Sequence, residues 1–196
     1  RPFVGQYPNF ERTDRRHDFS LVPPKQTVLD DLKDAGKDVI GVGKIYDIFA
    51  GKGITETTAN HGNKKNMEKV FELQKKDFHG LCYINLVDFD MIYGHRRDIL
   101  GYTNALNEFD KDFEIFLANM RGDDVLFITA DHGCDPGYKG TDHTRESVPL
   151  LGYSKCWKQG VNIGTRDTYA DIAATLAQIF EIEYHGDGTG FLEMLK

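Results

Sequence analysis

The stretch Val125-Leu126-Phe127-Ile128-Thr129-Ala130-Asp131-His132-Gly133 decides the fold of this chain. It begins with five residues rich in β-branched and aromatic side chains, preceded by the polar pair Asp123-Asp124. This pattern is typical of a buried parallel strand. Asp131 and His132 follow directly. Because α/β proteins bind ligands at the carboxyl ends of parallel strands, the pattern predicts that both side chains face a functional site.

Two other segments carry histidine and carboxylate side chains next to predicted strands. Asp88-Phe89-Asp90-Met91-Ile92-Tyr93-Gly94-His95 follows the apolar run 81–87, and Thr141-Asp142-His143-Thr144-Arg145-Glu146 precedes the run 148–151. Mixed imidazole and carboxylate ligands suit divalent metals of intermediate hardness. The three segments together therefore predict a metal site, whose candidate ligands are Asp90, His95, Asp131, His132 and His143.

Five candidate ligands exceed the roughly three or four protein ligands of a single zinc site, which favours two metals. Two cations about 3.5–4 Å apart can clamp the attacking and leaving oxygens of a phosphoryl displacement. Such mixed shells accept several metals, so Mn²⁺, Mg²⁺ and Zn²⁺ all remain possible.

Each motif taken alone also has a simpler structural interpretation. Asp131-His132-Gly133 is a common strand ending in which the histidine caps a helix, and His95 or His143 alone is equally well an exposed loop residue. The joint placement at predicted strand ends favours the metal site. The other histidines lack such settings, and we expect them to be surface or structural residues: His17, His61, His79 and His185.

The rest of the chain alternates between helical and strand patterns. Apolar spacing predicts helices over 27–35, 66–77, 97–120 and 169–180, and strands over 39–42, 81–87, 125–129 and 148–152. The last helix is expected to start at an N-cap formed by Thr168 or Asp167. Residues 1–24 show no periodic element, and residues 47–63 are expected to form a surface loop. This order predicts an α/β fold with a mostly parallel sheet and helices on both faces.

Composition narrows the functional classes. The 196 residues suffice for one domain or at most two, and the net charge of −7 argues against a nucleic-acid-binding surface. Three cysteines without a paired CxxC motif fit a reducing cytoplasm better than a disulfide framework. No apolar run reaches the roughly 18 residues that span a bilayer, and no secretory signal is recognisable, so we expect a cytoplasmic protein without membrane contact.

The metal motifs carry a family resemblance. DFDMIYGHRRD at 88–98, TADHG at 129–133 and GTDHTRE at 140–146 resemble the metal-binding segments of the alkaline phosphatase superfamily. Within that superfamily the segments YGHRRD and TDHTRESVPLL are most similar to the phosphopentomutase family. The similarity also includes RPFVG, NFERT, RHDF and VIGVGKIYDI, and so runs through nearly the whole chain.

The resemblance implies a partial alkaline-phosphatase-like core that binds two Mn²⁺ ions. It further implies an isomerase of nucleoside catabolism that interconverts ribose 1-phosphate and ribose 5-phosphate, and the deoxyribose pair, through a phosphorylated threonine. By position, Asp90, His95 and His143 match the ligands of one metal, and Asp131 with His132 match those of the other.

The chain departs from the family in its missing N-terminal half, which carries the threonine nucleophile and a further aspartate ligand. We therefore expect residues 1–24 to be the end of a cap domain with its return linker. Residues 25–196 are then the C-terminal half of the metal-binding core. No catalytic residue is assigned in this chain. We expect the fragment to be inactive alone and to need the missing half of the same protein as its partner.

Lys44, at the end of a predicted strand, and Arg12 are candidate contacts for the substrate phosphate, although a solvated surface position is the simpler interpretation of both. Two alternatives to the main hypothesis stay open. One is another superfamily member, such as a cofactor-independent phosphoglycerate mutase or a phosphatase. The other is a metal-binding domain without catalytic turnover.

Overall fold

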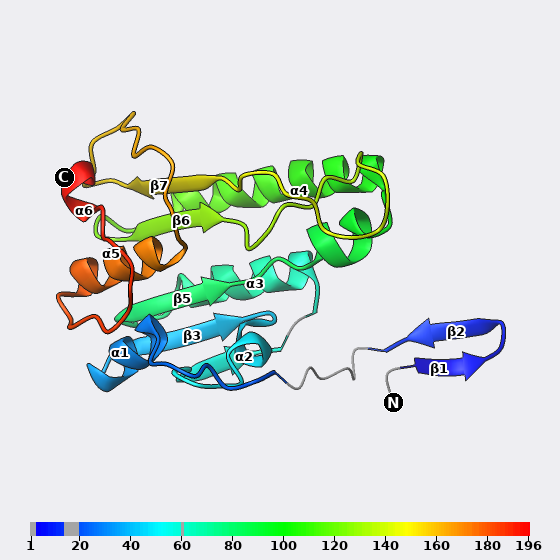
Figure 1. Cartoon of the computed structure of the whole chain (residues 1–196), viewed down its shortest axis with the longest axis horizontal. Helices are drawn as coiled ribbons and strands as arrows, with labels where there is room; N and C mark the ends of the chain where they lie inside the picture. Colours follow the sequence, from blue (N-terminus) through cyan, green and yellow to red (C-terminus); the bar gives the residue numbers. More distant parts are fainter. Residues whose placement is uncertain (1–2, 14–19, 60) are drawn as a thin grey trace.

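A computed structural model of the chain describes residues 3–13, 20–59 and 61–196. Its centre is a parallel three-stranded sheet in the order β4-β3-β5, formed by β3 (Asp38–Val42), β4 (Glu56–Thr58) and β5 (Gly80–Ile84). Figure 1 shows β3 and β5 pointing the same way, and β4 also pairs parallel with β3, so the carboxyl ends of the three strands share one edge of the sheet. The predicted α/β class is confirmed.

Alternation along β3 explains why helices cover both faces of this sheet. Val39 belongs to an apolar cluster with α1 (Val28–Asp34) and α5 (Ala170–Phe180), whereas Ile40 and Val42 contact Leu73. Leu73 ends α3 (Asn63–Leu73) on the opposite face. Successive side chains of a strand point to opposite faces, so a run of buried β-branched residues serves two helical layers at once.

The predicted strand 125–129 is correct in position but differs in its pairing. β6 (Val125–Thr129) is half-buried and pairs antiparallel with β7 (Leu150–Ser154), with Phe127 opposite Gly152. The prediction of a buried parallel strand at 125–129 is therefore wrong: among the described residues, β6 forms an antiparallel ladder with β7. A parallel partner needs a crossover element, whereas residues 130–149 return as a loop that contains no helix.

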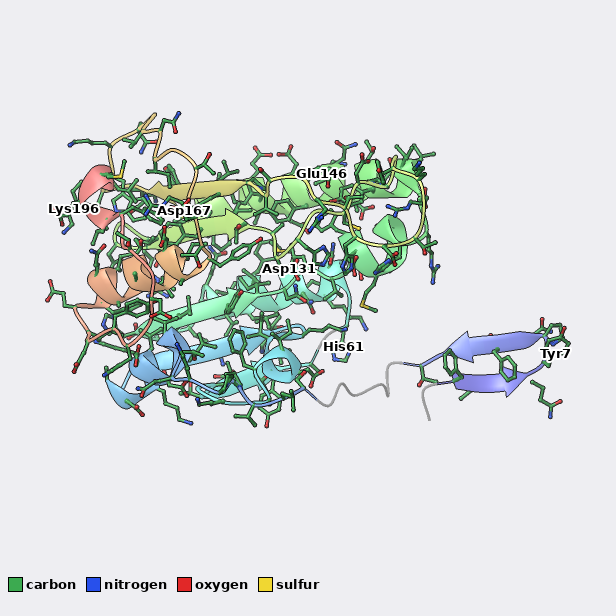
Figure 2. The ribbon with its side chains drawn as sticks, viewed as in Figure 1. Tyr7, His61, Asp131, Glu146, Asp167 and Lys196 are labelled. Carbon is green, nitrogen blue, oxygen red and sulfur yellow. The ribbon has the colours of Figure 1, made fainter. Side chains whose placement is uncertain are left out.

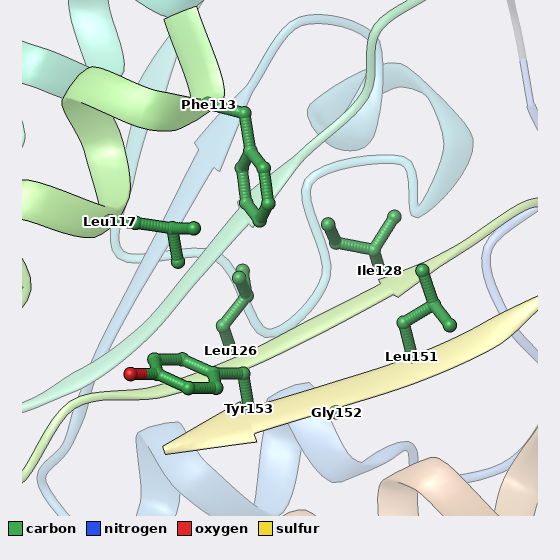
Figure 3. A pocket seen from close by; sticks show the side chains of 7 residues that line it. All are labelled: Phe113, Leu117, Leu126, Ile128, Leu151, Gly152 and Tyr153. Atoms are coloured by element: carbon green, nitrogen blue, oxygen red, sulfur yellow. The ribbon is translucent and has the colours of Figure 1, made fainter. Parts of the chain in front are cut away.

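The helix α4 (Ile99–Ala118) covers one face of the β6-β7 pair. A cavity of about 200 Å³ lies between them, walled almost wholly by carbon atoms, and Figure 3 shows the residues that line it. Its lining residues come from α4, β6 and β7: Phe113, Leu117, Leu126, Ile128, Leu151, Gly152 and Tyr153.

No helix in the described ranges is long and apolar enough to cross a membrane.

Two segments without a predicted element do contain short strands. β1 (Phe3–Gln6) and β2 (Asn9–Arg12) form an antiparallel hairpin within residues 1–24. β4 and the short helix α2 (Ile45–Ile48) overlap the predicted loop 47–63. Strands of three or four residues are too short for a period to emerge, and the polar β4 is held by its ladder to β3.

The helix starts follow local capping chemistry in part. Asp30 accepts a hydrogen bond from the backbone N–H of Thr27 at 2.8 Å, which closes a capping box at the start of α1. Thr168, one of the two predicted caps of α5, does bond to its first turn: its Oγ1 atom accepts a hydrogen bond from the backbone N–H of Ala170 at 3.2 Å. The residue directly before the helix, Tyr169, makes no side-chain capping bond. The chain ends in the short helix α6 (Leu192–Leu195).

Candidate metal centre

Asp90 lies on a π-helix, η1 (Phe89–Gly94), which follows β5 at the carboxyl edge of the sheet, and His95 is the C-cap of this helix. The backbone N–H of His95 donates to the carbonyl oxygen of Asp90 at 3.0 Å, which is the five-residue hydrogen bond of a π turn. The spacing Asp-x4-His thus equals one turn of this helix. Both side chains consequently lie on one face, and π-helical turns of this kind occur frequently at functional sites.

Asp90, His95 and His143 converge on one point. The Nε2 atoms of His95 and His143 each lie 3.3 Å from Oδ1 of Asp90, and the three ligand atoms are all within 4.8 Å of one another. Metal–ligand bonds of about 2.1 Å place neighbouring ligand atoms roughly 3–4 Å apart. The observed spacing therefore fits one divalent cation with positions left open for other ligands.

A backbone carbonyl fixes the orientation of His95. Its Nδ1 atom lies 2.6 Å from the carbonyl oxygen of Thr141. A carbonyl oxygen only accepts hydrogen bonds, so Nδ1 carries the proton and Nε2 presents its lone pair towards Asp90. Hydrogen bonding of the non-ligating ring nitrogen is the usual support of a metal-binding histidine.

Cys134 contacts the same carboxylate, a contact that sequence reasoning missed. Its Sγ atom donates to Oδ1 of Asp90 at 3.4 Å. Burial, followed by the hydrogen bond to Asp90, raises the pKa of the thiol to about 11. Without a bound metal, Cys134 is therefore a protonated hydrogen-bond donor at neutral pH. Its position directly after the Asp-His-Gly motif was the only signal in the sequence.

Asp131 and His132 form a separate pair beside the three-residue group. Asp131 follows β6 at the carboxyl edge, where Figure 2 labels it, and its Oδ1 atom lies 3.6 Å from Nε2 of His132. The His132 ring stacks on the ring of His143 with centroids 3.7 Å apart. Among the described residues the pair offers two possible ligands, fewer than a metal site normally has.

A close backbone contact brings His143 to this edge. The N–H of Thr144 donates to the carbonyl oxygen of Gly133 at 3.0 Å, forming an isolated β-bridge. A Cβ atom on Gly133 would lie 2.5 Å from Oε2 of Glu146 and 2.8 Å from the Thr144 carbonyl oxygen. The motif therefore needs glycine because another backbone passes against it.

The other predicted site residues are placed less fully. Lys44 follows β3 at the same carboxyl edge and is the N-cap of α2. Arg12 is the last residue of β2, and its side chain lies outside the described residues. Tyr169 adds a contact that sequence reasoning missed: its hydroxyl donates to the carbonyl oxygen of Asp131 at 3.0 Å.

Comparison with known families agrees with this geometry. The family description "Metalloenzyme superfamily" matches residues 6–184, a span that contains all the candidate ligands. The chain belongs to the metalloenzyme superfamily. The alkaline-phosphatase-like fold class expected from the sequence is consistent with that membership.

Curated relatives of this metalloenzyme chain are phosphopentomutases. It is 50% identical over 193 residues to that of Lachnoclostridium phytofermentans and 53% identical over 192 residues to that of Acetivibrio thermocellus, in each case covering 98% of the chain and 50% of the relative. The phosphopentomutase of Carboxydothermus hydrogenoformans is 54% identical over 183 residues, which are 93% of the chain and 47% of the relative. The chain thus spans about half the length of the curated relatives it matches.

Proposed function

We propose that this chain is the metal-binding half of a cytoplasmic phosphopentomutase that interconverts pentose 1-phosphates and pentose 5-phosphates through a phosphothreonine. One observation carries the proposal: three ligand atoms, from Asp90, His95 and His143, converge within 4.8 Å in a chain about 50% identical to phosphopentomutases. A chain that shared only its overall fold with phosphopentomutases would not be expected to keep this side-chain geometry.

In this proposal Asp90, His95 and His143 hold one cation, and Asp131 with His132 supplies part of the shell of a second. Bound Mn²⁺ would polarise phosphoryl oxygens and lower the pKa of an attacking hydroxyl. Lys44, at the same edge, would contact the substrate phosphate. The oxygen and nitrogen ligands also suit Mg²⁺ or Zn²⁺, so the donor set favours a divalent cation without selecting one.

The exposed sheet edges support the assignment of residues 25–196 as half of a core domain. Figure 1 draws β6 on the side of β5 away from β3, yet no backbone ladder joins β5 to β6 among the described residues. Tyr83 on β5 and Leu151 on β7 remain 41% and 61% exposed. Unpaired strand edges and exposed apolar side chains favour pairing with another segment.

We further propose that the half of the relatives that this chain does not cover packs against these edges and completes the second metal site. It would also supply the threonine nucleophile, so this chain alone is expected to be inactive. Residues 1–24 would be the end of the cap domain and its return linker.

Complementation tests the proposed function. A polypeptide matching the uncovered half of the Acetivibrio thermocellus relative would be co-expressed with this chain, and the conversion of ribose 5-phosphate to ribose 1-phosphate followed by phosphorus NMR with Mn²⁺. We expect turnover from the pair, none from either half, and none with His143→Ala. The matched control is His79→Gln, which replaces a histidine that packs on Phe180. A stable but inactive complex would contradict the proposal.

A metal-binding domain without turnover is the second candidate, because the group of Asp90, His95 and His143 is complete within this chain. The same assay separates the two, since a domain of that kind binds Mn²⁺ without converting the sugar phosphate in any combination of halves. Offering 3-phosphoglycerate in parallel tests the phosphoglycerate mutase alternative.

A further inference from the structure

Arg97 binds the loop that leads to His143 at three points. Its Nη1 atom lies 2.6 Å from the carbonyl oxygen of Asp135, and its Nη2 atom lies 2.7 Å from that of Asp142. Its Nε atom also donates to the carbonyl oxygen of Gly140. All three acceptors are backbone atoms, so the guanidinium fixes the path of the loop and not the identity of its side chains.

The backbone of Arg97 is held in a conformation that aims its side chain at this loop. Its φ is +57°, in the left-handed region that non-glycine residues seldom occupy. Such strain persists only where the surroundings determine the conformation, and it is common next to functional sites. Arg97 stands two residues after His95, so the same short turn carries a candidate ligand and its link to the opposite loop.

Apart from Arg97, the loop is held by individual hydrogen bonds: Cys134 contacts Asp90, the N–H of Asp135 donates to Oγ1 of Thr144, and the carbonyl oxygen of Thr141 contacts His95. Its base is fixed by the bridge between Gly133 and Thr144, while residues 134–143 contain no helix or strand. Asp142 directly precedes His143, and its carbonyl oxygen is one of the three that Arg97 binds. The position of His143 relative to His95 therefore depends on the Arg97 contacts together with the bond between Nδ1 of His95 and the carbonyl oxygen of Thr141.

We propose that Arg97 is a positioning residue for the metal site, which holds the loop 134–143 so that His143 meets Asp90 and His95. This inference rests on the metal site of the proposed function. The fork geometry of arginine is required, because a lysine keeps the charge but cannot bind three carbonyls in one plane. We expect the loss of these bonds to weaken Mn²⁺ binding about 10- to 100-fold, the range found when groups that orient metal ligands are removed.

The test uses two measurements on Arg97→Ala, Arg97→Lys and the matched control Arg96→Ala, whose exposed arginine is the immediate neighbour. The first is the rate of trypsin cleavage after Lys139, at the exposed part of the loop, in metal-free protein. The second is Mn²⁺ affinity by calorimetry. We expect both Arg97 variants to be cleaved at least ~10-fold faster and to bind Mn²⁺ more weakly, while Arg96→Ala behaves as the parent. Thermal unfolding midpoints within a few degrees of the parent would show that the fold is intact.

The outcomes separate the clamp from the metal site. Parental cleavage and parental affinity in Arg97→Ala would overturn the inference, and full recovery by Arg97→Lys would overturn the requirement for three bonds. If the parent chain itself bound no Mn²⁺, the proposed metal site would fail. The clamp would then be upheld or rejected by the cleavage rate after Lys139 alone.

Discussion

Nδ1 of His95 lies 2.6 Å from the carbonyl oxygen of Thr141, although 46 positions of sequence separate the two residues. This bond joins the turn after β5 to the loop before β7. It also sets the proton on Nδ1, which leaves Nε2 directed at Asp90, 3.3 Å away. The candidate metal centre is thus supported by a contact between two loops.

Ligand truncation should distinguish the group of Asp90, His95 and His143 from the pair of Asp131 and His132. We expect His95→Ala and His143→Ala to lower Mn²⁺ affinity more than ~100-fold, since each removes a ligand that converges on Asp90. Asp131→Ala should cost this chain less than ~10-fold because Asp131 lies outside the three-residue group. Calorimetric titration measures all three beside His79→Gln. Equal losses in the three variants would mean that the five residues bind as one unit.

The close contact at Gly133 predicts a local cost of adding one methyl group. Gly133→Ala would force its Cβ to 2.8 Å from the carbonyl oxygen of Thr144 and 2.9 Å from the backbone nitrogen of Glu146, and we expect the free energy of unfolding to fall by about 2 kcal/mol. Gly122→Ala is the matched control, since a Cβ there meets no atom within 4 Å. It should change stability by less than about 0.5 kcal/mol. Urea unfolding measures the change in unfolding free energy of both variants. Equal changes would show that the close contact at Gly133 has no energetic cost.

The pair of His185 and the buried Asp31 predicts a pH-dependent term in stability. Nδ1 of His185 lies 2.8 Å from Oδ1 of Asp31, and this hydrogen bond, with the neighbouring acidic charges, raises the pKa of the histidine above its ordinary 6.5. A raised folded pKa adds stability that is fully present below 6.5 and is lost as the pH rises through the folded pKa.

Thermal melting therefore should separate the parent from His185→Gln most clearly below pH 6.5, and the difference in melting temperature should narrow as the pH rises through the folded pKa. A proton NMR titration of the His185 ring gives the folded pKa directly. A gap that stays constant with pH would show that the contact contributes packing or neutral hydrogen bonding only.

The cysteines should differ in reactivity. Burial raises the pKa of Cys82 to about 12, and burial with the Asp90 hydrogen bond raises that of Cys134 to about 11, whereas Cys156 is exposed. At pH 8 on the order of one in a thousand Cys134 thiols is ionised. We expect iodoacetamide to modify Cys156 first, with all three sites equalised in urea. Mass spectrometry after short exposures checks this, and early labelling of Cys134 would argue against the Asp90 contact.

The positions of the long elements were predictable because their patterns are local. Apolar spacing located α3, α4, α5 and the strands β3, β5 and β6 to within a few residues. The short β1, β2 and β4 escaped because three or four residues carry no period, and their ladders are formed by partners elsewhere in the chain. The antiparallel direction of β7 depended on the course of the loop after β6, which no local pattern encodes.

The sequence by itself determined which residues are candidate ligands, because histidine and carboxylate side chains at strand ends are a matter of residue type and order. The sequence also shows the Asp-x4-His spacing, but it does not show that this spacing corresponds to one turn of a π-helix. The family resemblance implied that Asp90, His95 and His143 form one group and Asp131 with His132 another, and the tertiary structure places the first three ligand atoms within 4.8 Å of one another. It also revealed the contacts of Cys134 and Arg97, since bonds between distant loops arise from the packing of the whole chain.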